Sequence, residues 1–376
     1  MNDKEEILGV LWIGGQSSRF TGPSEPAPIK MDSNKIFALL HEKPLFTWAF
    51  ENLRKVVDRC VFSFNSSIQY NRFKSFIHQA SIILPEFDAI VDSPIVPTRG
   101  PLQAQLTVLR KFTHASRIVT VSADMPFIPP SLIETLLLEP TSITTLQSSN
   151  NVIEPLVSVF FVKKCKPARN FLLFFPFGRA DDFHRCVDTL TLVTVSSDYP
   201  SKMTPWNQNI NFSEDIAKLN QKLSPFTTGY KPNNRNFIKK KRTIECNNPK
   251  TQLVISELNL TQEGEKSEIE KNRDFDDLIQ LKGFFYAGRY AEFIALNSEH
   301  MKAKQWFSKA SSSYWNETQF WMKEKVPFLA IHSLKDCHQC MKRSGLNYTW
   351  KLEANDLLVE LEQQLNLSKS TRESHG

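Results

Sequence analysis

The N-terminal part of the chain contains an apolar segment that runs directly into a pair of glycines. Residues 7–13 have the composition of a buried strand, and they are followed by Gly14, Gly15, Ser17 and Arg19. Glycine lets a backbone approach a ligand closely and adopt angles that other residues avoid. Backbone N–H groups exposed in such a turn, beside a cation, bind anions such as the phosphates of a nucleotide. The segment therefore predicts a strand followed by an anion-binding turn.

Strand-like and helix-like patterns alternate from about residue 6 to residue 223. The expected strands are Ile7–Ile13, Arg59–Phe64, Ile82–Leu84, Ile118–Ser122, Ser142–Leu146, Leu156–Val162 and Leu190–Val195. The expected helices are Pro44–Val56, Gln69–Gln79, Leu102–Phe112, Ser131–Leu138, Pro167–Phe175 and one that starts at Ser213. This alternation predicts a Rossmann-like α/β fold with a mostly parallel sheet. Ligands of such sheets bind at the carboxyl ends of the strands.

The rest of the chain divides into two further parts. Residues 224–273 are rich in Asn, Lys, Glu, Thr and Pro without strong periodicity, so we expect a polar linker. Residues 274–368 show helical spacing of apolar and aromatic side chains, which predicts a small α-helical bundle. The segment Tyr286–Glu292 is similar to a tetratricopeptide unit, but one unit is not a repeat array. The expected domains are thus 1–223, 224–273 and 274–368, and the helical part is a candidate surface for a protein partner.

The bulk composition excludes several classes of protein. The net charge of +6 is mild, and the one dense basic run, Lys239–Arg242, falls in the expected linker, so we expect no nucleic acid partner. No apolar run approaches the ~20 residues that span a bilayer, so we expect no membrane partner. The N-terminus is charged and lacks the apolar core of a secretory signal, which predicts a cytoplasmic protein with reduced cysteines.

A zinc site is conceivable at the pair Cys337 and Cys340, with His332 and His338 nearby. Structural zinc normally takes four ligands, often from two cysteine pairs, and the sequence has no second CxxC. The surrounding pattern is that of one continuous helix. A metal site here is therefore disfavoured.

Chemically useful residues follow the expected strands. Lys35 could neutralise phosphate charge as a point cation, although a solvated loop lysine would look the same. Asp92 could bind a base or a ribose, or serve a turn. Gly100–Pro101 then starts a helix. Asp124 comes directly after the strand Ile118–Ser122 and before a proline-rich loop, where a carboxylate can hold Mg²⁺ against substrate phosphates or cap a turn. We favour the metal.

These motifs, in this order, resemble the molybdenum cofactor guanylyltransferases (the MobA family) and their nucleotidyltransferase relatives. The family opens with Leu-Ala-Gly-Gly-x-Ser-x-Arg-Met-Gly-x-Asp-Lys, and the corresponding residues here are Trp12–Phe20 and then Asn34-Lys35. The family also has Lys-Pro-Leu after an apolar stretch, and Lys43-Pro44-Leu45 stands at the expected separation from Lys35. This spacing identifies Lys35, rather than Lys30, as the lysine of the family motif. Further matches are Asp92 with Gly100–Leu102, Ala123–Pro130, Glu154–Leu156 and Asn209–Ile216.

The chain also departs from the family pattern. Ile13 replaces a small residue, Asn34 replaces the acid before the lysine, and about a dozen residues are inserted before Lys35. The inserted segment 21–33 holds three prolines and would enlarge a loop over the nucleotide. The asparagine usually found in the second strand is Ser63 here, with Asn65 two residues further on. The helical C-terminal part has no counterpart in the minimal family member.

The resemblance implies that GMP is transferred from GTP to molybdopterin with release of pyrophosphate, with Mg²⁺ as cofactor. It implies catalytic roles for Arg19, Lys35 and Asp124, the last as the metal ligand. It implies substrate contacts for Trp12, Ile13, Gly14, Gly15, Ser17, Lys35, Asn65, Asp92, Asn209 and Asn211, with the last two on the pterin side.

Two alternatives remain open. The nearest is another nucleotidyltransferase, such as one that loads CMP on molybdopterin or activates a sugar phosphate. An alternative of a different class is a catalytically inactive nucleotide-binding scaffold joined to an interaction bundle. Asn34 and the inserted loop favour the scaffold, whereas Arg19, Lys35, Asp92 and Asp124 favour the enzyme.

Overall fold

The fold is taken from a computed structural model of the chain. The structure describes residues 6–14, 35–85, 87–196, 206–207, 210, 213–222, 237–248, 250–251, 254–255, 258, 266–346 and 351–373.

One eight-stranded sheet forms the centre of the molecule, with the strand order β10-β9-β7-β8-β6-β1-β4-β5. Strands β5, β4, β1 and β6 are parallel, β7 and β9 are parallel to each other, and β8 and β10 are antiparallel to their neighbours. The mostly parallel α/β fold predicted from the sequence is confirmed. The strands are β1 (Ile7–Trp12), β4 (Arg59–Phe64), β5 (Asp88–Val91), β6 (Arg117–Ser122), β7 (Ile143–Ser148), β8 (Ile153–Phe161), β9 (Thr189–Val195) and β10 (Ile238–Glu245).

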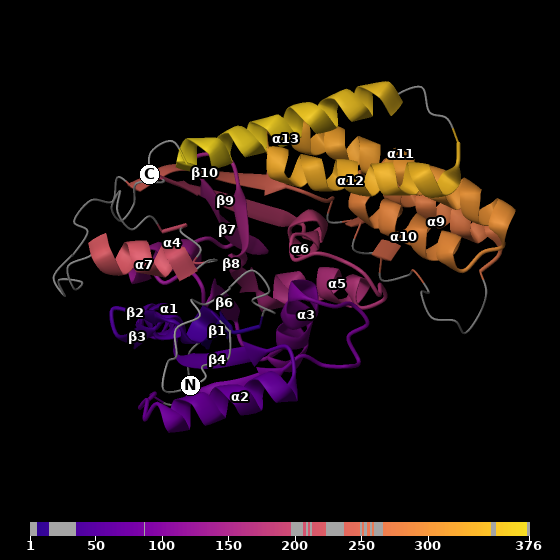
Figure 1. The fold of residues 1–376 in the computed structure, drawn as a ribbon. Helices are drawn as coiled ribbons and strands as arrows, with labels where there is room; N and C mark the ends of the chain where they lie inside the picture. The colour runs from indigo at the N-terminus through magenta and orange to yellow at the C-terminus, as the bar shows by residue number, and fades with distance from the viewer. Residues whose placement is uncertain are drawn as a thin grey trace.

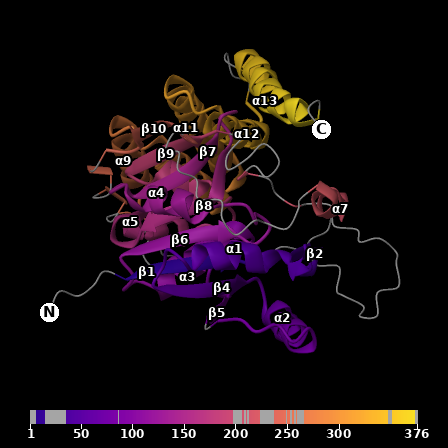
Figure 2. The same ribbon diagram turned by 90° about the vertical axis from the view of Figure 1, so that its left-hand side faces the viewer.

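Helices cover both faces of the sheet (Figures 1 and 2). Helices α1 (Leu45–Leu53), α2 (Ser67–Gln79) and α4 (Pro130–Leu137) contribute to the core on one face. Helices α3 (Pro101–Lys111), α5 (Val162–Leu172) and α6 (Asp182–Cys186) contribute to the core on the other. Strand β1 supplies both cores by alternation: Leu8, Val10 and Trp12 face α3, and Leu11 and Ile13 face α1.

A small antiparallel pair stands apart from the main sheet. Strands β2 (Leu39–Leu40) and β3 (Lys43–Pro44) follow the short helix η1 (Lys35–Phe37). Helix α7 (Ser213–Lys222) packs against this pair, and Asn220 is hydrogen-bonded to the backbone of both His41 and Leu39. The pair, α7 and Phe127 share a small apolar cluster, which fixes the chain just after Lys35.

Two expected boundaries in the first half of the chain are wrong. The segment 82–84 forms no strand: Ile83 is 95% exposed, and the edge strand is β5, four residues further on. Helix α5 begins at Val162 rather than at Pro167, which lies inside it. Periodicity alone places neither boundary, because an apolar triplet does not show whether it pairs with a neighbouring strand.

The predicted polar linker over 224–273 is also wrong in part. Residues 238–245 form β10, which pairs with β9 and makes one edge of the sheet. The basic run Lys239–Arg242 therefore lies on a strand, where Lys241 pairs with Glu139 at 2.7 Å. Charged side chains are usual on an edge strand because they block further pairing, and they hide the strand from a hydrophobicity pattern.

The C-terminal part is helical as expected and packs tightly on the sheet domain. Figures 1 and 2 show it gathered at the end of the molecule that carries β9 and β10. Its helices share one continuous apolar core with α3, α5 and α6. It consists of α9 (Glu268–Gln280), α10 (Phe284–Leu296), α11 (His300–Lys323), α12 (Pro327–Ser344) and α13 (Lys351–Glu373).

Cys337 and Cys340 lie in α12, where both side chains are buried. Burial raises the pKa of Cys337 to about 12, so this thiol stays protonated. Among the described residues, no group of three or more His, Cys, Asp or Glu side chains could hold a metal ion. No helix in the described part of the chain has the length and apolar character to cross a bilayer.

A buried ion network joins the helical part to the sheet domain. The Arg185 guanidinium, fully buried on α6, pairs with Glu317 of α11 at 2.7 Å and with Asp336 of α12 at 2.7 Å. Arg289 of α10 pairs with Asp182 at 2.8 Å. Burial alone would raise the pKa of Asp336, but Arg185 and Arg289 outweigh it and hold that pKa well below its ordinary value. Asp336 is therefore ionised in the folded protein.

Replacing Arg185 with methionine should destabilise the protein by about 3–5 kcal/mol, because Glu317 and Asp336 would remain buried with part of their compensation lost. Urea unfolding followed by circular dichroism measures this difference. The matched control is Lys335→Met, which breaks an exposed pair with Glu362 and should cost about 1 kcal/mol or less. Equal effects of the two substitutions would contradict the assigned role of the network.

Candidate functional site

The site begins at the point where the strand order reverses. The chain runs from β1 outward to β4 and β5, then returns to the other side of β1 as β6. Trp12 stands in register with Ser122 of β6 and with Ser63 of β4, so these three strands end together. Ligands of open α/β sheets bind at such a reversal, beyond the carboxyl ends of the strands.

Asp124 and Lys35 form an ion pair beyond the end of β6. The Lys35 Nζ lies 2.5 Å from the Asp124 Oδ2, and each side chain is 17% exposed. The Ser122 hydroxyl donates to the other carboxylate oxygen at 2.6 Å, and the Ile210 N–H donates to the Asp124 carbonyl at 3.0 Å. The loop after β6 is thus held in place, and the two charges are separated by 89 positions in the sequence but adjacent in the fold.

The donor set around Asp124 suits a hard divalent cation that arrives with its substrate. One carboxylate and a neighbouring hydroxyl supply oxygen ligands, and Mg²⁺ is commonly bound by one or two carboxylates together with substrate phosphates. Within the part of the chain that the structure describes, no further carboxylate completes a metal cage. The residues therefore fit a metal–nucleotide complex better than a free ion.

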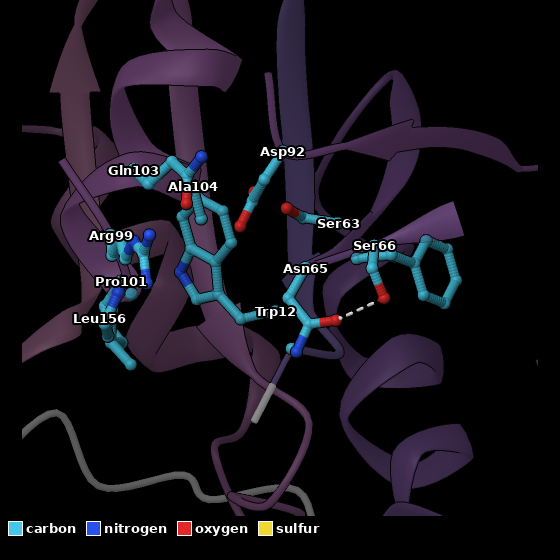
Figure 3. Close-up of a pocket in the computed structure, with 13 residues that line it drawn as sticks. Trp12, Ser63, Asn65, Ser66, Asp92, Arg99, Pro101, Gln103, Ala104 and Leu156 are labelled. Carbon is cyan, nitrogen blue, oxygen red and sulfur yellow. Dashed lines mark hydrogen bonds between the residues drawn. The ribbon is translucent and has the colours of Figure 1, made fainter. Parts of the chain in front are cut away.

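A pocket of about 630 Å³ opens at the ends of β1, β4 and β5 (Figure 3). Its volume is typical of small-ligand sites. Its wall on the α3 side comes from the start of that helix, where Gly100 adopts a φ of +71°. The lining residues are Trp12, Gly14, Ser63, Phe64, Asn65, Ser66, Asp92, Arg99, Gly100, Pro101, Gln103, Ala104 and Leu156.

Asp92 is the acidic group of the pocket. It follows β5, and its N–H donates to the Phe64 carbonyl at 2.9 Å. Its Oδ1 is buried and has no hydrogen-bond partner among the described residues. Burial raises the pKa of this carboxyl to about 7, because its charged form is poorly solvated. A carboxylate in this state favours a ligand that brings hydrogen-bond donors.

The turn after β4 ties the strand ends together. The Asn65 N–H donates to Gln69 Oε1 at 2.9 Å, and the Gln69 amide donates to the Ile13 carbonyl at 3.2 Å. Ser66 caps α2 by accepting from the Gln69 N–H, and its hydroxyl donates to Asn65 at 3.0 Å (Figure 3). A Cβ on Gly14 would lie 3.6 Å from the Asn65 nitrogen, which is ordinary contact. The rim of the pocket is therefore fixed without bulky side chains.

The predicted site residues fall into three groups. Trp12, Gly14, Asn65 and Asp92 line the pocket, and Lys35 pairs with Asp124 outside the lining. The Ile13 side chain is 1% exposed in the core on the α1 side, so only its backbone is near the site. Five predicted residues lie outside the described part of the chain: Gly15, Ser17, Arg19, Asn209 and Asn211.

Several lining residues were not predicted to be site residues, although some lie in or next to motifs already noted. Arg99 precedes the Gly100–Pro101 helix start, and Leu156 belongs to the Glu154–Leu156 match. Gln103 and Ala104 reach the pocket only because α3 begins there. Nothing in their local sequence indicates a ligand contact.

Residues 9–172 match the sequence model of the MobA-like NTP transferase domain, and this match indicates a nucleotidyltransferase. A search of curated proteins finds no match to the chain.

Solved structures that are similar to part of this chain include the following three. Rv0371c from Mycobacterium tuberculosis H37Rv is 14% identical, with a TM-score of 0.41 over 58% of this chain and 98% of that one. Molybdopterin-guanine dinucleotide biosynthesis protein A from Archaeoglobus fulgidus is 17% identical, with a TM-score of 0.41 over 57% and 97%. The 4-diphosphocytidyl-2C-methyl-D-erythritol synthase from Anaerococcus prevotii is 12% identical, with a TM-score of 0.40 over 58% and 95%.

Replacing Asp92 with asparagine should stabilise the ligand-free protein by about 1–2 kcal/mol at pH 8, because a partly buried charge is removed. The carboxyl has a higher pKa folded than unfolded, so its cost builds up as pH rises from about 4 to about 7 and is constant above. Urea unfolding at pH 4, 6 and 8 should therefore show the gain growing with pH. A gain that is the same at all three values would contradict the buried-charge explanation.

Proposed function

We propose that the protein is a molybdenum cofactor guanylyltransferase that transfers GMP from GTP to molybdopterin and releases pyrophosphate. The observation that carries this proposal is a nucleoside-sized pocket at the ends of β1, β4 and β5, together with the Lys35–Asp124 pair beyond the end of the neighbouring strand β6. The proposal is also supported by the MobA-like match over residues 9–172. In this arrangement the pocket takes the guanosine, and the charged pair takes the phosphates.

Asp92 is proposed to select the base. An ionised aspartate only accepts hydrogen bonds, and guanine offers adjacent donors at its imino N–H and its amino group. The unpartnered buried oxygen of Asp92 makes a base without those donors costly to bind. This favours GTP over the cytidine and adenine nucleotides.

Three residues are proposed to compensate the phosphate charge, one of them through a bound metal ion. Lys35 leaves Asp124 and pairs with phosphate oxygens once a triphosphate is bound, which keeps both charges compensated. Arg19 and the backbone of the Gly14–Gly15 turn are proposed to contact the same phosphates. Asp124 would hold Mg²⁺, which when bound neutralises charge on the phosphate oxygens as a Lewis acid. Asn209 and Asn211 are proposed to face the pterin.

The reaction itself needs no covalent bond to the protein. A phosphate oxygen of molybdopterin attacks the α-phosphorus of GTP in line, a new phosphoanhydride bond forms, and the bond to pyrophosphate breaks. The protein positions the two substrates and compensates the charge that builds up on the leaving pyrophosphate. Those are tasks that a fixed lysine and a fixed carboxylate can perform.

The direct test is incubation of the purified protein with GTP, Mg²⁺ and molybdopterin, with mass spectrometry for the dinucleotide and an assay for pyrophosphate. We expect product with GTP and much less with CTP. Product with CTP would identify a cytidylyltransferase, and turnover with a sugar phosphate alone would identify a sugar-nucleotide enzyme. Nucleotide binding without product in any arm would identify an inactive scaffold.

Asp124→Ala should lower kcat about 10³-fold or more, because loss of the metal ligand removes several kcal/mol of charge stabilisation. Circular dichroism and thermal melting should show an intact fold. The matched control is Glu139→Ala, which removes a carboxylate that also pairs with a lysine, Lys241, on the surface. Activity close to wild type in Asp124→Ala would refute the metal assignment.

Lys35→Ala should weaken GTP binding about tenfold or more, since a charge-assisted contact to phosphate is lost. Isothermal titration calorimetry with GTP and with guanosine separates the two halves of the ligand: affinity for GTP should fall and affinity for guanosine should hold. Lys241→Ala is the control for loss of a paired lysine elsewhere. Unchanged affinity for GTP in Lys35→Ala would count against the phosphate role.

A further inference from the structure

A tryptophan forms part of the pocket lining that is proposed to take the base. Trp12 is the last residue of β1, and its side chain is 6% exposed. Figure 3 shows the flat face of its indole framed by Asp92, Ser63 and Asn65 on one side and by Arg99 and Leu156 on the other. No other lining residue except Phe64 has an aromatic ring.

The indole is held rigidly in this place. Trp12 belongs to the core cluster on the α3 side, and its backbone is paired with strands on both sides. Its carbonyl accepts from the Ala123 N–H at 3.1 Å, immediately before Asp124. The ring therefore presents a fixed surface that loses little conformational entropy when a ligand contacts it.

The indole also carries a polar group that the protein does not satisfy. Its Nε1 is buried and has no hydrogen-bond partner among the described residues, as is true of Asp92 Oδ1 in the same pocket. A buried donor left alone costs about 1–3 kcal/mol. A core position chosen only for packing would be filled more stably by an apolar side chain of similar size. The two residues that carry these groups line one cavity, which suits a ligand that is both flat and polar.

We propose that Trp12 is a specificity-determining residue: its indole is the surface on which the nucleotide base stacks, while Asp92 accepts hydrogen bonds from the edge of that base. The larger purine ring covers more of the indole than a pyrimidine does, so Trp12 favours purines and Asp92 chooses guanine among them. This inference rests on the proposed function, because it takes the pocket to be the base site.

The test uses tryptophan fluorescence of the full chain during titration with GTP, together with calorimetry on the same samples. Stacking on guanine should quench part of the emission in the wild type. Inorganic triphosphate, which has no base, should leave the emission unchanged. In Trp12→Phe the GTP-dependent quenching should disappear. In Trp315→Phe, which removes a half-buried tryptophan of α11 far along the chain, the quenching should remain.

Affinity gives the second measurement. Trp12→Leu should weaken GTP binding about tenfold or more, in line with the loss of base–aromatic stacking, while affinity for inorganic triphosphate stays within about twofold of wild type. Trp12→Phe keeps a ring and should fall between the two. If the leucine variant fails to fold, the quenching in wild type, Trp12→Phe and Trp315→Phe still shows whether the base stacks on Trp12.

Two failures are distinguishable. GTP binding by calorimetry with quenching that persists in Trp12→Phe would overturn the stacking role and leave the proposed function standing. Calorimetry that detects no binding of GTP or of any other nucleoside triphosphate to the wild type would overturn the proposed function and this inference with it.

Discussion

The contact between Arg185 and the two carboxylates of α11 and α12 is the interaction on which the rest of the structure depends. A guanidinium without water must be compensated, and its partners lie 132 and 151 positions further along the chain. Asp182, three positions earlier on α6, supplies part of this compensation, and the helical part supplies the rest. The shared apolar core also links the two parts, because α10, α11 and α12 contribute to one cluster of buried side chains with α3, α5 and α6.

Several features of the fold and site follow from local sequence. Local sequence patterns predict the turn after β1, the carboxylates after β5 and β6, and most of the helices. Each of these patterns is formed by residues that are close together in the sequence. Lys35 and Asp124 were each assigned to a phosphate site from their positions in the sequence, and in the structure they form an ion pair at 2.5 Å. Asp92 was assigned to a nucleoside site on its position after a strand, and it lines the pocket.

Other features have no local signal. Strand β10 is rich in lysine, because charged side chains on an edge strand prevent pairing with another chain. The same side chains give the segment the composition of a polar linker. The ion network joins residues on α6 to three helices. The sequence around Arg185 contains no pattern that predicts Glu317 as its partner. The contribution of Ala104 and Leu156 to the pocket depends on how α3 and β8 meet β1. The direction of the Trp12 ring depends on which face of β1 meets α3, which is a property of the packed sheet.

The two margins of the sheet differ in a way that bears on how copies of the protein meet. At one margin, β5 is only four residues long, and at the other, β10 carries four consecutive cationic side chains. A second molecule that tried to extend the sheet at β10 would bring its own row of like charges against this one, and at β5 it would find too few backbone groups to pair. Crowded solutions of this protein should consequently resist ribbon-like association at either margin.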